Sequence, residues 1–471
     1  MFARALLLAL ALASAAGPVR ATPPTLRVDI QHAGDAHVER YALERVVGEP
    51  LPWPGNPAHP IDGSNLGSQK FEVADAATGE LLYSRGYSTV FGEWRTTGEA
   101  KAMQRSFQES LRFPMPDAPV ELTVFGRDGD NRFVPSWSVT IDPAALDVER
   151  GPTAMADRWP VGMPIAIRRN GAPADKVDLL LLGDGYTADE MDAFEARARE
   201  LADTLFSVSP FKERAADFNV WALAVPVPES GVSRPSTGIH RASATGARYD
   251  IFGSERYILT LDNRAFRDLA QYAPYDFVEI MVNGDTYGGG GIFGQFSTVA
   301  AGNDWRDYVF VHEFGHHFAA LADEYYTSPV AYGAADHPRV EPWEPNVTAL
   351  LDPERVKWLS QVTPATPVPT PWPKEAYEDY ERGIQARRKR LREERRPEAE
   401  MSALFHEEQR HIETLFAQAA HRDAVGAFQG GNYSATGYYR PQLNCLMFTR
   451  TDAFCQVCQG AIEVVIDMYS R

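Results

Sequence analysis

The sequence predicts an α+β protein whose amino-terminal part is a β-sandwich and whose later part alternates strands with helices. Two observations support this fold class. Short segments that alternate apolar and polar residues crowd the stretch from 25 to 142, whereas continuous apolar runs separated by helical segments begin at residue 177. The 471 residues are enough for two or three domains of ordinary size.

The amino-terminal part carries the alternation typical of half-buried strands. The clearest segments are residues 26–30, 120–125 and 133–139. The turn-rich residues 127–132 between the last two indicate a β-hairpin. One helix is expected to interrupt the strands over residues 99–111. We assign residues 22–150 to this sandwich domain.

The later part begins with an apolar run of buried-strand length at residues 177–182. Thr187 and Glu190 then form a capping box, which predicts the start of a helix. Two further apolar runs, residues 218–225 and 277–282, follow as strands. Strand, helix and strand in this order indicate an α/β unit.

A heavily charged block at residues 374–423 interrupts this second domain, which we assign to residues 151–471. The block holds 11 basic and 12 acidic residues, so its charges nearly cancel. It predicts an exposed helix or helical hairpin, with Pro397 as the break. Although residues 387–390 are all basic, the interleaved glutamates favour a solvated, salt-bridged face over a nucleic-acid site.

Residues 1–21 have the form of a secretory signal peptide. Arg4 supplies a positive start, an apolar run covers residues 5–13, and small residues follow. This run is too short to cross a bilayer, which takes about 20 apolar residues. We therefore expect a secreted or periplasmic protein with no membrane anchor after cleavage. The formal net charge of −18 argues against nucleic acid and anionic lipid as partners.

Two other features leave alternatives open. The glycine run at residues 288–291 predicts either a strand edge that receives an extended peptide or a mobile surface loop. It lacks the signature of a phosphate-binding loop. In an exported protein the three cysteines, Cys445, Cys455 and Cys458, favour one local disulfide with one thiol left over, although a metal site is the rival interpretation. Which pair would form stays open.

The strongest chemical signal is the H-E-x-x-H motif formed by His312, Glu313 and His316. Histidines four positions apart share one face of a helix and can bind one zinc ion. Glu313 beside the metal could act as the general base that activates a zinc-bound water, which is the chemistry of peptide-bond hydrolysis. His317 lies 100° round the helix and is expected to be a packing or surface residue.

A catalytic zinc ion needs a third protein ligand. We favour Asp323, with Glu324 or a more distant residue as alternatives. On an unbroken helix Asp323 would lie about 10 Å beyond His316 along the axis, so the helix must end and turn back near residues 320–322. Neither glycine nor proline is present there to indicate such a turn.

The motif, followed by the Leu-Ala-Asp-Glu-Tyr-Tyr stretch at 321–326, resembles the IgA peptidase family of zinc metallopeptidases. Further similar segments are residues 91–94, 106–116, 177–187, 343–348 and 445–458. The resemblance implies a metzincin-like catalytic domain behind a β-sandwich. It implies His312 and His316 as zinc ligands, Glu313 as general base and, less securely, Asp323 as third ligand.

The resemblance has one departure and one further implication. Metzincins normally have glycine and histidine where this chain has Ala319 and Ala322, which puts the third ligand in doubt. Met447 looks like their methionine turn beneath the zinc, although a plain core methionine is equally compatible.

We therefore expect an exported zinc metallopeptidase that acts on a peptide or protein substrate. Two alternatives are a catalytically silent peptide- or glycan-binding protein of the same fold, and a zinc hydrolase of a non-peptide bond. Intact Glu313 argues against the silent protein. Cleavage of IgA is not assigned, and substrate specificity and oligomeric state stay open.

Overall fold

The computed structural model describes the chain except for residues 1–21, 152–158, 160 and 328–339. The predicted signal peptide therefore lies outside the described residues. Among the helices of the described part, none combines the length and the apolar character needed to cross a bilayer.

The amino-terminal part is built from two four-stranded sheets, as the sandwich prediction requires. One sheet has the order β5-β1-β2-β8, with bounds Arg105–Pro114, Pro24–Gly34, Glu39–Pro52 and Glu149–Arg150. The other has the order β4-β3-β6-β7, with bounds Leu81–Tyr87, Gln69–Asp75, Val120–Arg127 and Phe133–Ile141. The expected hairpin is the antiparallel pair β6–β7. Apolar side chains from both sheets share one core.

The helix predicted over residues 99–111 is wrong. Only Glu99–Lys101 form a short 3₁₀ turn, and residues from Arg105 onward form strand β5, which pairs antiparallel with β1. The short helix of this region lies earlier, at α1 (Val90–Arg95). Phe107, Leu111 and Phe113 alternate along β5 into buried positions, so long-range pairing overrode the local helix-forming composition.

The second domain is organised around a six-stranded sheet of order β15-β16-β14-β10-β11-β9. The strands span Gly289–Ile292, Phe296–Ala300, Phe277–Val282, Val177–Asp184, Phe218–Ala224 and Ile165–Arg168. Strands β10, β11, β14 and β16 run parallel, while β15 and β9 run antiparallel at the two edges. The three predicted strands of this region are thus confirmed.

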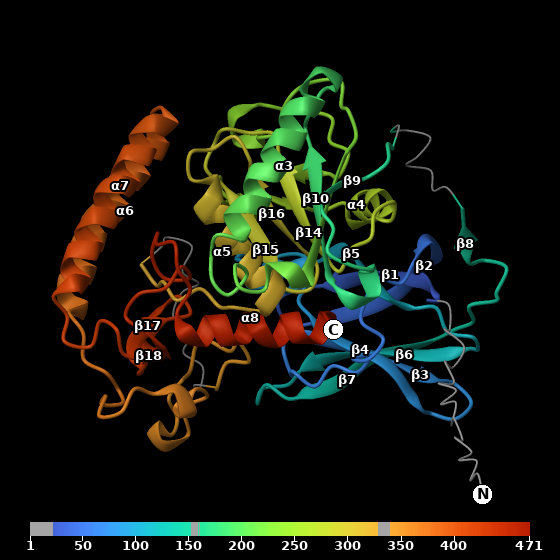
Figure 1. The fold of residues 1–471 in the computed structure, drawn as a ribbon, viewed down its shortest axis with the longest axis horizontal. Helices are drawn as coiled ribbons and strands as arrows, with labels where there is room; N and C mark the ends of the chain where they lie inside the picture. The colour runs from blue at the N-terminus through green and yellow to red at the C-terminus, as the bar shows by residue number, and fades with distance from the viewer. Residues whose placement is uncertain (1–21, 152–158, 160, 328–339) are drawn as a thin grey trace, which may run out of the picture.

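Helices cover both faces of this sheet, which explains why β10 is buried along its whole length. Leu179 and Leu181 point into a core shared with α3, α5 and α8, whose bounds are Met191–Leu205, Arg306–Ala319 and Gln456–Tyr469. Leu180 and Leu182 point into the opposite core, which includes α4 (Asn263–Ala270). Figure 1 shows α3 and α5 on the near side of the sheet, with α8 running below them.

The charged block forms the predicted helical hairpin. Helix α6 spans Lys374–Glu393, and α7 spans Glu398–Ala417 with Pro397 at its start. In Figure 1 the hairpin stands at the left edge of the molecule. Two small hairpins complete the fold: β12–β13 (Ala247–Arg248 and Leu259–Thr260) and β17–β18 (Phe428–Gly431 and Ser434–Arg440).

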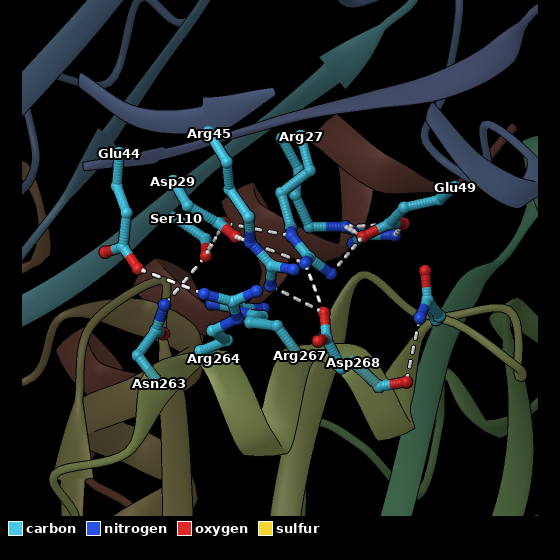
Figure 2. A network of polar contacts seen from close by, with 12 residues as sticks. Arg27, Asp29, Glu44, Arg45, Glu49, Ser110, Asn263, Arg264, Arg267 and Asp268 are labelled. Atoms are coloured by element: carbon cyan, nitrogen blue, oxygen red, sulfur yellow. Dashed lines mark hydrogen bonds and ion pairs between the residues drawn. The ribbon is translucent and has the colours of Figure 1, made fainter. Parts of the chain in front are cut away.

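The two parts of the molecule meet through a buried network of charged side chains (Figure 2). Along β1, Leu26, Val28 and Ile30 fill the sandwich core, while the polar side chains on the other face turn toward α4. Asp268 on α4 accepts hydrogen bonds from Arg27 at 2.5 Å and from Arg45 at 2.7 Å. The polar face of this strand is therefore an interface between the domains rather than a solvated surface.

Candidate metal centre

Helix α5 carries the H-E-x-x-H motif and packs against the glycine-rich edge strand β15. A Cβ atom on Gly291 would lie 2.4 Å from the carbonyl oxygen of Glu313 and 2.9 Å from the Cβ of His316. Gly289 would meet Val309 of the same helix at 2.6 Å. The glycines thus let the strand approach the helix closely. The run forms the terminal strand of the sheet, so the mobile loop is wrong, while binding of an extended peptide at this edge stays a prediction.

Two nitrogen atoms and one oxygen atom of the predicted ligands form a small triangle. The Nε2 atoms of His312 and His316 are 3.3 Å apart. The Oδ1 atom of Asp323 lies 3.1 Å from the first and 3.3 Å from the second. A tetrahedral zinc ion bound at about 2.0–2.1 Å holds its ligand atoms about 3.3–3.4 Å apart. The triangle therefore fits such an ion.

The remaining atoms of these side chains are held by hydrogen bonds that leave the triangle free. Nδ1 of His312 lies 3.1 Å from the carbonyl oxygen of Leu446, and Nδ1 of His316 lies 2.5 Å from that of Leu321. Each imidazole can thus donate from Nδ1 and keep the Nε2 lone pair for a metal. The Tyr433 hydroxyl donates to Oδ2 of Asp323, whereas its buried Oδ1 makes no hydrogen bond.

The electrostatics of the site also favour a cation. Burial opposes the charged form of Asp323, but His316 and His312 outweigh that effect and lower its pKa well below the usual range. Burial likewise opposes the charged form of His316, yet Asp323 raises the pKa of this imidazole to about 9. Without a metal the site would hold a proton between these groups, and a metal ion would replace it.

The chain reaches Asp323 by ending α5 abruptly. Ala320 takes a left-handed conformation with φ of 55°, and its N–H bonds the carbonyls of Gly315 and His316. The buried side chain of Asn346 then holds Ala322 from both sides, accepting from its N–H at 2.8 Å and donating to its carbonyl at 2.9 Å. The turn that direct ligation requires is present, although an alanine makes it.

Asp323 and Glu324 point in different directions. Asp323 faces the two histidines, whereas Glu324 is fully buried and hydrogen-bonds Asn346 at 2.9 Å and the Sγ of Cys458 at 3.4 Å. Of the two carboxylates considered for the third ligand, the structure thus brings only Asp323 to the motif.

His317 has the packing role expected of it, and it is fully buried. Its Nδ1 lies 3.1 Å from the carbonyl oxygen of Ile292, and its Nε2 accepts the N–H of Val278 at 3.2 Å. Burial lowers its pKa to about 3, so the ring is neutral. It ties α5 to strands β15 and β14 and does not face the metal triangle.

Met447 lies directly beneath the motif. Its Sδ atom would be 3.2 Å from a Cβ atom on Gly315, the residue just before His316. The neighbouring Leu446 supplies the carbonyl for His312, and the Met447 carbonyl accepts the N–H of Glu324 at 2.9 Å. The segment at Leu446 and Met447 thus supports both α5 and the residues that follow it, as a methionine turn would.

Comparison with known families agrees with this geometry. The family model for IgA Peptidase M64 matches residues 165–466, and the model for the Peptidase M64 N-terminus matches residues 20–138. The chain belongs to the IgA peptidase M64 family. The resemblance found in the sequence is therefore confirmed. No curated protein matches the chain.

Membership of the M64 family makes the chain a metallopeptidase by class. Two hollows meet at Glu313, which lines both. One contains His316, Asp323 and Tyr433 and reaches Glu93 and Thr97 of the amino-terminal domain. The other contains His312 and is walled by the insertion, through Tyr377, Glu381, Gln385, Arg388 and Glu408. Arg256 and Tyr325 line both hollows.

Several of these M64 site residues escaped the sequence analysis. Tyr433 sits in the β17–β18 turn with φ of 60°, next to Asn432 with φ of 46°. Gly-Gly-Asn at 430–432 could have indicated a tight hairpin, but nothing local shows that its tip reaches Asp323. Arg256 and Arg388 carry no motif, and only the folded chain brings them to the site.

Proposed function

We propose that this M64 protein is an exported zinc metallopeptidase in which His312, His316 and Asp323 hold the metal and Glu313 is the general base. The observation that carries the proposal is the triangle of their two Nε2 atoms and one Oδ1 atom, with separations of 3.1–3.3 Å. Glu313 belongs to the same cluster of potential ligand side chains as the two histidines.

The chemistry divides between the metal and the chain. Zinc bound there would polarise the scissile carbonyl and lower the pKa of the attacking water. Glu313 accepts the proton of that water and then delivers it to the departing amine. Tyr433 holds the second oxygen of Asp323, and two backbone carbonyls hold the imidazoles, so the ligand set is preorganised.

The surroundings of Glu313 support a peptide as substrate. Strand β15 is the terminal strand of the sheet beside α5. Gly289 already exchanges main-chain hydrogen bonds with Arg256 and Ile258, so an extended peptide would add at the other end of the strand, where Gly291 lines the hollow at Glu313. The hollows on both sides of Glu313 would receive side chains from either side of the cleaved bond. Export is proposed from the signal-like residues 1–21.

The test is cleavage of a diverse peptide mixture, read by mass spectrometry, with the zinc-loaded protein lacking residues 1–21. Glu313→Gln should lose at least about 100-fold in rate while it keeps its zinc, because the substitution removes only the base. Glu354→Gln, at an exposed position, is the control and should cut like the wild type.

Equal activity of wild type and Glu313→Gln would remove Glu313 from the mechanism. Equal inactivity of both, with zinc bound and ester or glycan substrates turned over instead, would favour a non-peptide hydrolase. Inactivity on all substrates would favour the silent binding protein.

A further inference from the structure

A second cluster of metal-binding side chains lies behind the candidate metal centre. It contains three thiols and one carboxylate, whose ligand atoms all lie within 4.8 Å of one another. The members are Glu324, Cys445, Cys455 and Cys458. All four are buried, none with more than 5% of its surface exposed. None of them lines either hollow at Glu313.

Two distances in the cluster match tetrahedral coordination. The Sγ atoms of Cys445 and Cys458 are 3.7 Å apart, and Cys458 Sγ lies 3.4 Å from Oε1 of Glu324. A zinc ion bound at about 2.3 Å to sulfur and about 2.0 Å to oxygen spaces such atoms about 3.8 Å and about 3.5 Å apart. The cluster is thus already close to the size that the ion requires.

The backbone supports thiolates at these positions. The N–H of Cys455 donates to Sγ of Cys445 at 3.2 Å, and the N–H of Cys458 donates to Sγ of Cys455 at 3.4 Å. The latter bond also caps the start of α8. N–H donors directed at sulfur stabilise the negative charge that a metal-bound thiolate carries.

A disulfide, which we favoured from the sequence, explains less. All three cysteines are free thiols in the structure, and 3.7 Å is far beyond the S–S bond length of about 2.0 Å. A disulfide would also leave one thiol and the Glu324 carboxylate buried without a function. The Oε2 atom of Glu324 is buried and makes no hydrogen bond, whereas Oε1 accepts from Asn346, so a metal ion bound by both oxygens of this carboxylate would supply the missing partner.

We propose that the chain binds a second, structural zinc ion in this closed site of three thiolates and one carboxylate. Soft sulfur ligands in a tetrahedron select zinc among the common divalent cations. The local sequence favoured the disulfide because no histidine lies between the three thiols, and the fourth ligand, Glu324, lies more than a hundred residues away in the chain.

The position of the second zinc ion would let it support the first site. Glu324 follows Asp323 directly, and Cys445 directly precedes Leu446, whose carbonyl holds His312. The second zinc would therefore fasten the two segments that complete the catalytic ligand set to the start of α8. It acts as a positioning element and does not touch the substrate. The inference does not depend on the reaction that the first site performs.

Metal content tests the proposal on the full mature chain. Zinc per chain is measured by mass spectrometry after dialysis for the wild type, for His312→Ala/His316→Ala and for Cys455→Ser/Cys458→Ser. We expect two, one and one zinc ions per chain. One ion in the wild type and none in the histidine variant would overturn the inference while leaving the proposed metal of the first site intact. One ion in both would support the second site and count against the first.

Because the cysteine variant could fail to fold, the histidine variant gives an independent test. All four cluster residues remain in it. Loaded with Co²⁺, it should show the near-ultraviolet charge-transfer band of cobalt bound to thiolates, and Glu324→Gln in that background should weaken cobalt binding at least 10-fold. A spectrum without that band would overturn the inference. So would an intact mass two hydrogens lower under non-reducing conditions, since that result shows a disulfide.

Discussion

At the scale of single residues, the proposed site depends on how each candidate ligand is held as much as on which residue it is. The two imidazoles and Asp323 each use one atom for a hydrogen bond and leave one atom facing the triangle. Such supporting contacts fix orientation, and losing one typically weakens metal binding without unfolding the protein.

Tyr433→Phe tests this idea. The substitution removes the hydroxyl that donates to Oδ2 of Asp323 and keeps the ring. We expect zinc affinity at the first site to fall by about 10–100-fold, measured by competition with a chelator. The melting temperature of the metal-free protein should change little. An unchanged affinity would mean that the hydroxyl does not position the ligand.

A second residue-scale prediction concerns His32 in the sandwich. Burial opposes its charged form, but Glu109 at 2.6 Å and Glu39 at 3.0 Å outweigh that effect and raise its pKa. A pKa raised by folding stabilises the native state below the unfolded value of about 6.5, and this stability is lost as the pH rises through the folded value.

The free energy of unfolding should therefore separate wild type from His32→Gln more at pH 6 than at pH 9. Urea denaturation at both pH values measures this difference in the free energy of unfolding. Taking the difference between wild type and variant cancels the contributions of the other titrating groups. A constant difference across this range would show that the ion pairs of His32 contribute nothing.

At the scale of elements, the sequence predicted regular patterns well and turns poorly. The apolar run at β10 and the 187–190 capping box are confirmed, since Thr187 donates its N–H to Glu190 at 2.8 Å. Ala320 is a turn that the sequence did not indicate. Its left-handed conformation brings Asp323 to the metal triangle, yet alanine carries no signal for such a turn. The tertiary bonds of Asn346 supply what the local sequence lacks.

The α6–α7 insertion is an element whose function the sequence left open, and its contacts place it beside the reaction. Arg388 lines the hollow that contains His312 and Glu313, while the neighbouring Arg387 faces outward and pairs with Glu407 at 2.5 Å. The two arginines are therefore a matched pair, one at the cleft and one at the surface.

We expect Arg388→Gln to lower kcat/KM at least about 5-fold for peptides that place an acidic side chain in this hollow, since the half-buried guanidinium there would pair with it. Arg387→Gln should change kcat/KM less than 2-fold, because exposed ion pairs contribute little. Kinetics with paired acidic and neutral peptides measure the effect. Equal responses of the two variants would show that the insertion does not contact substrate.

At the scale of the whole molecule, the candidate site draws on every part of the chain. Glu93 and Thr97 come from the amino-terminal domain, and the opposite hollow is walled by the insertion. The family and the fold class could be predicted from motifs and alternation. The docking of the two domains could not, because an alternating strand such as β1 normally turns its polar face to water.

The buried network of Figure 2 joins the two domains beside an apolar core that both share, which includes Phe91 and Phe107 from one domain and Phe266 from the other. Arg27 and Arg45 meet on Oδ1 of Asp268, and Asp29 accepts from both arginines as well. Arg27 is fully buried, and Asp268 is 2% exposed. Removing one partner of such a network leaves the opposite charges buried and unpaired in a medium of low dielectric. The free-energy cost of that exceeds what the intact pairs contribute to stability.

Asp268→Ala should therefore lower the free energy of unfolding by about 3–5 kcal/mol. Calorimetry should show the loss as a lower melting temperature of the variant. Glu44→Gln is the control: its pairing with the half-exposed Arg264 at 3.6 Å lies at the rim of the same interface, and glutamine keeps one oxygen to accept from Gln31 or Gln108, so the loss should stay below about 1 kcal/mol. If Asp268→Ala were as mild as the control, the domains would be held by their apolar contacts. The hollow that reaches Glu93 would then keep its shape without the network, and peptide cleavage by the variant would be unchanged.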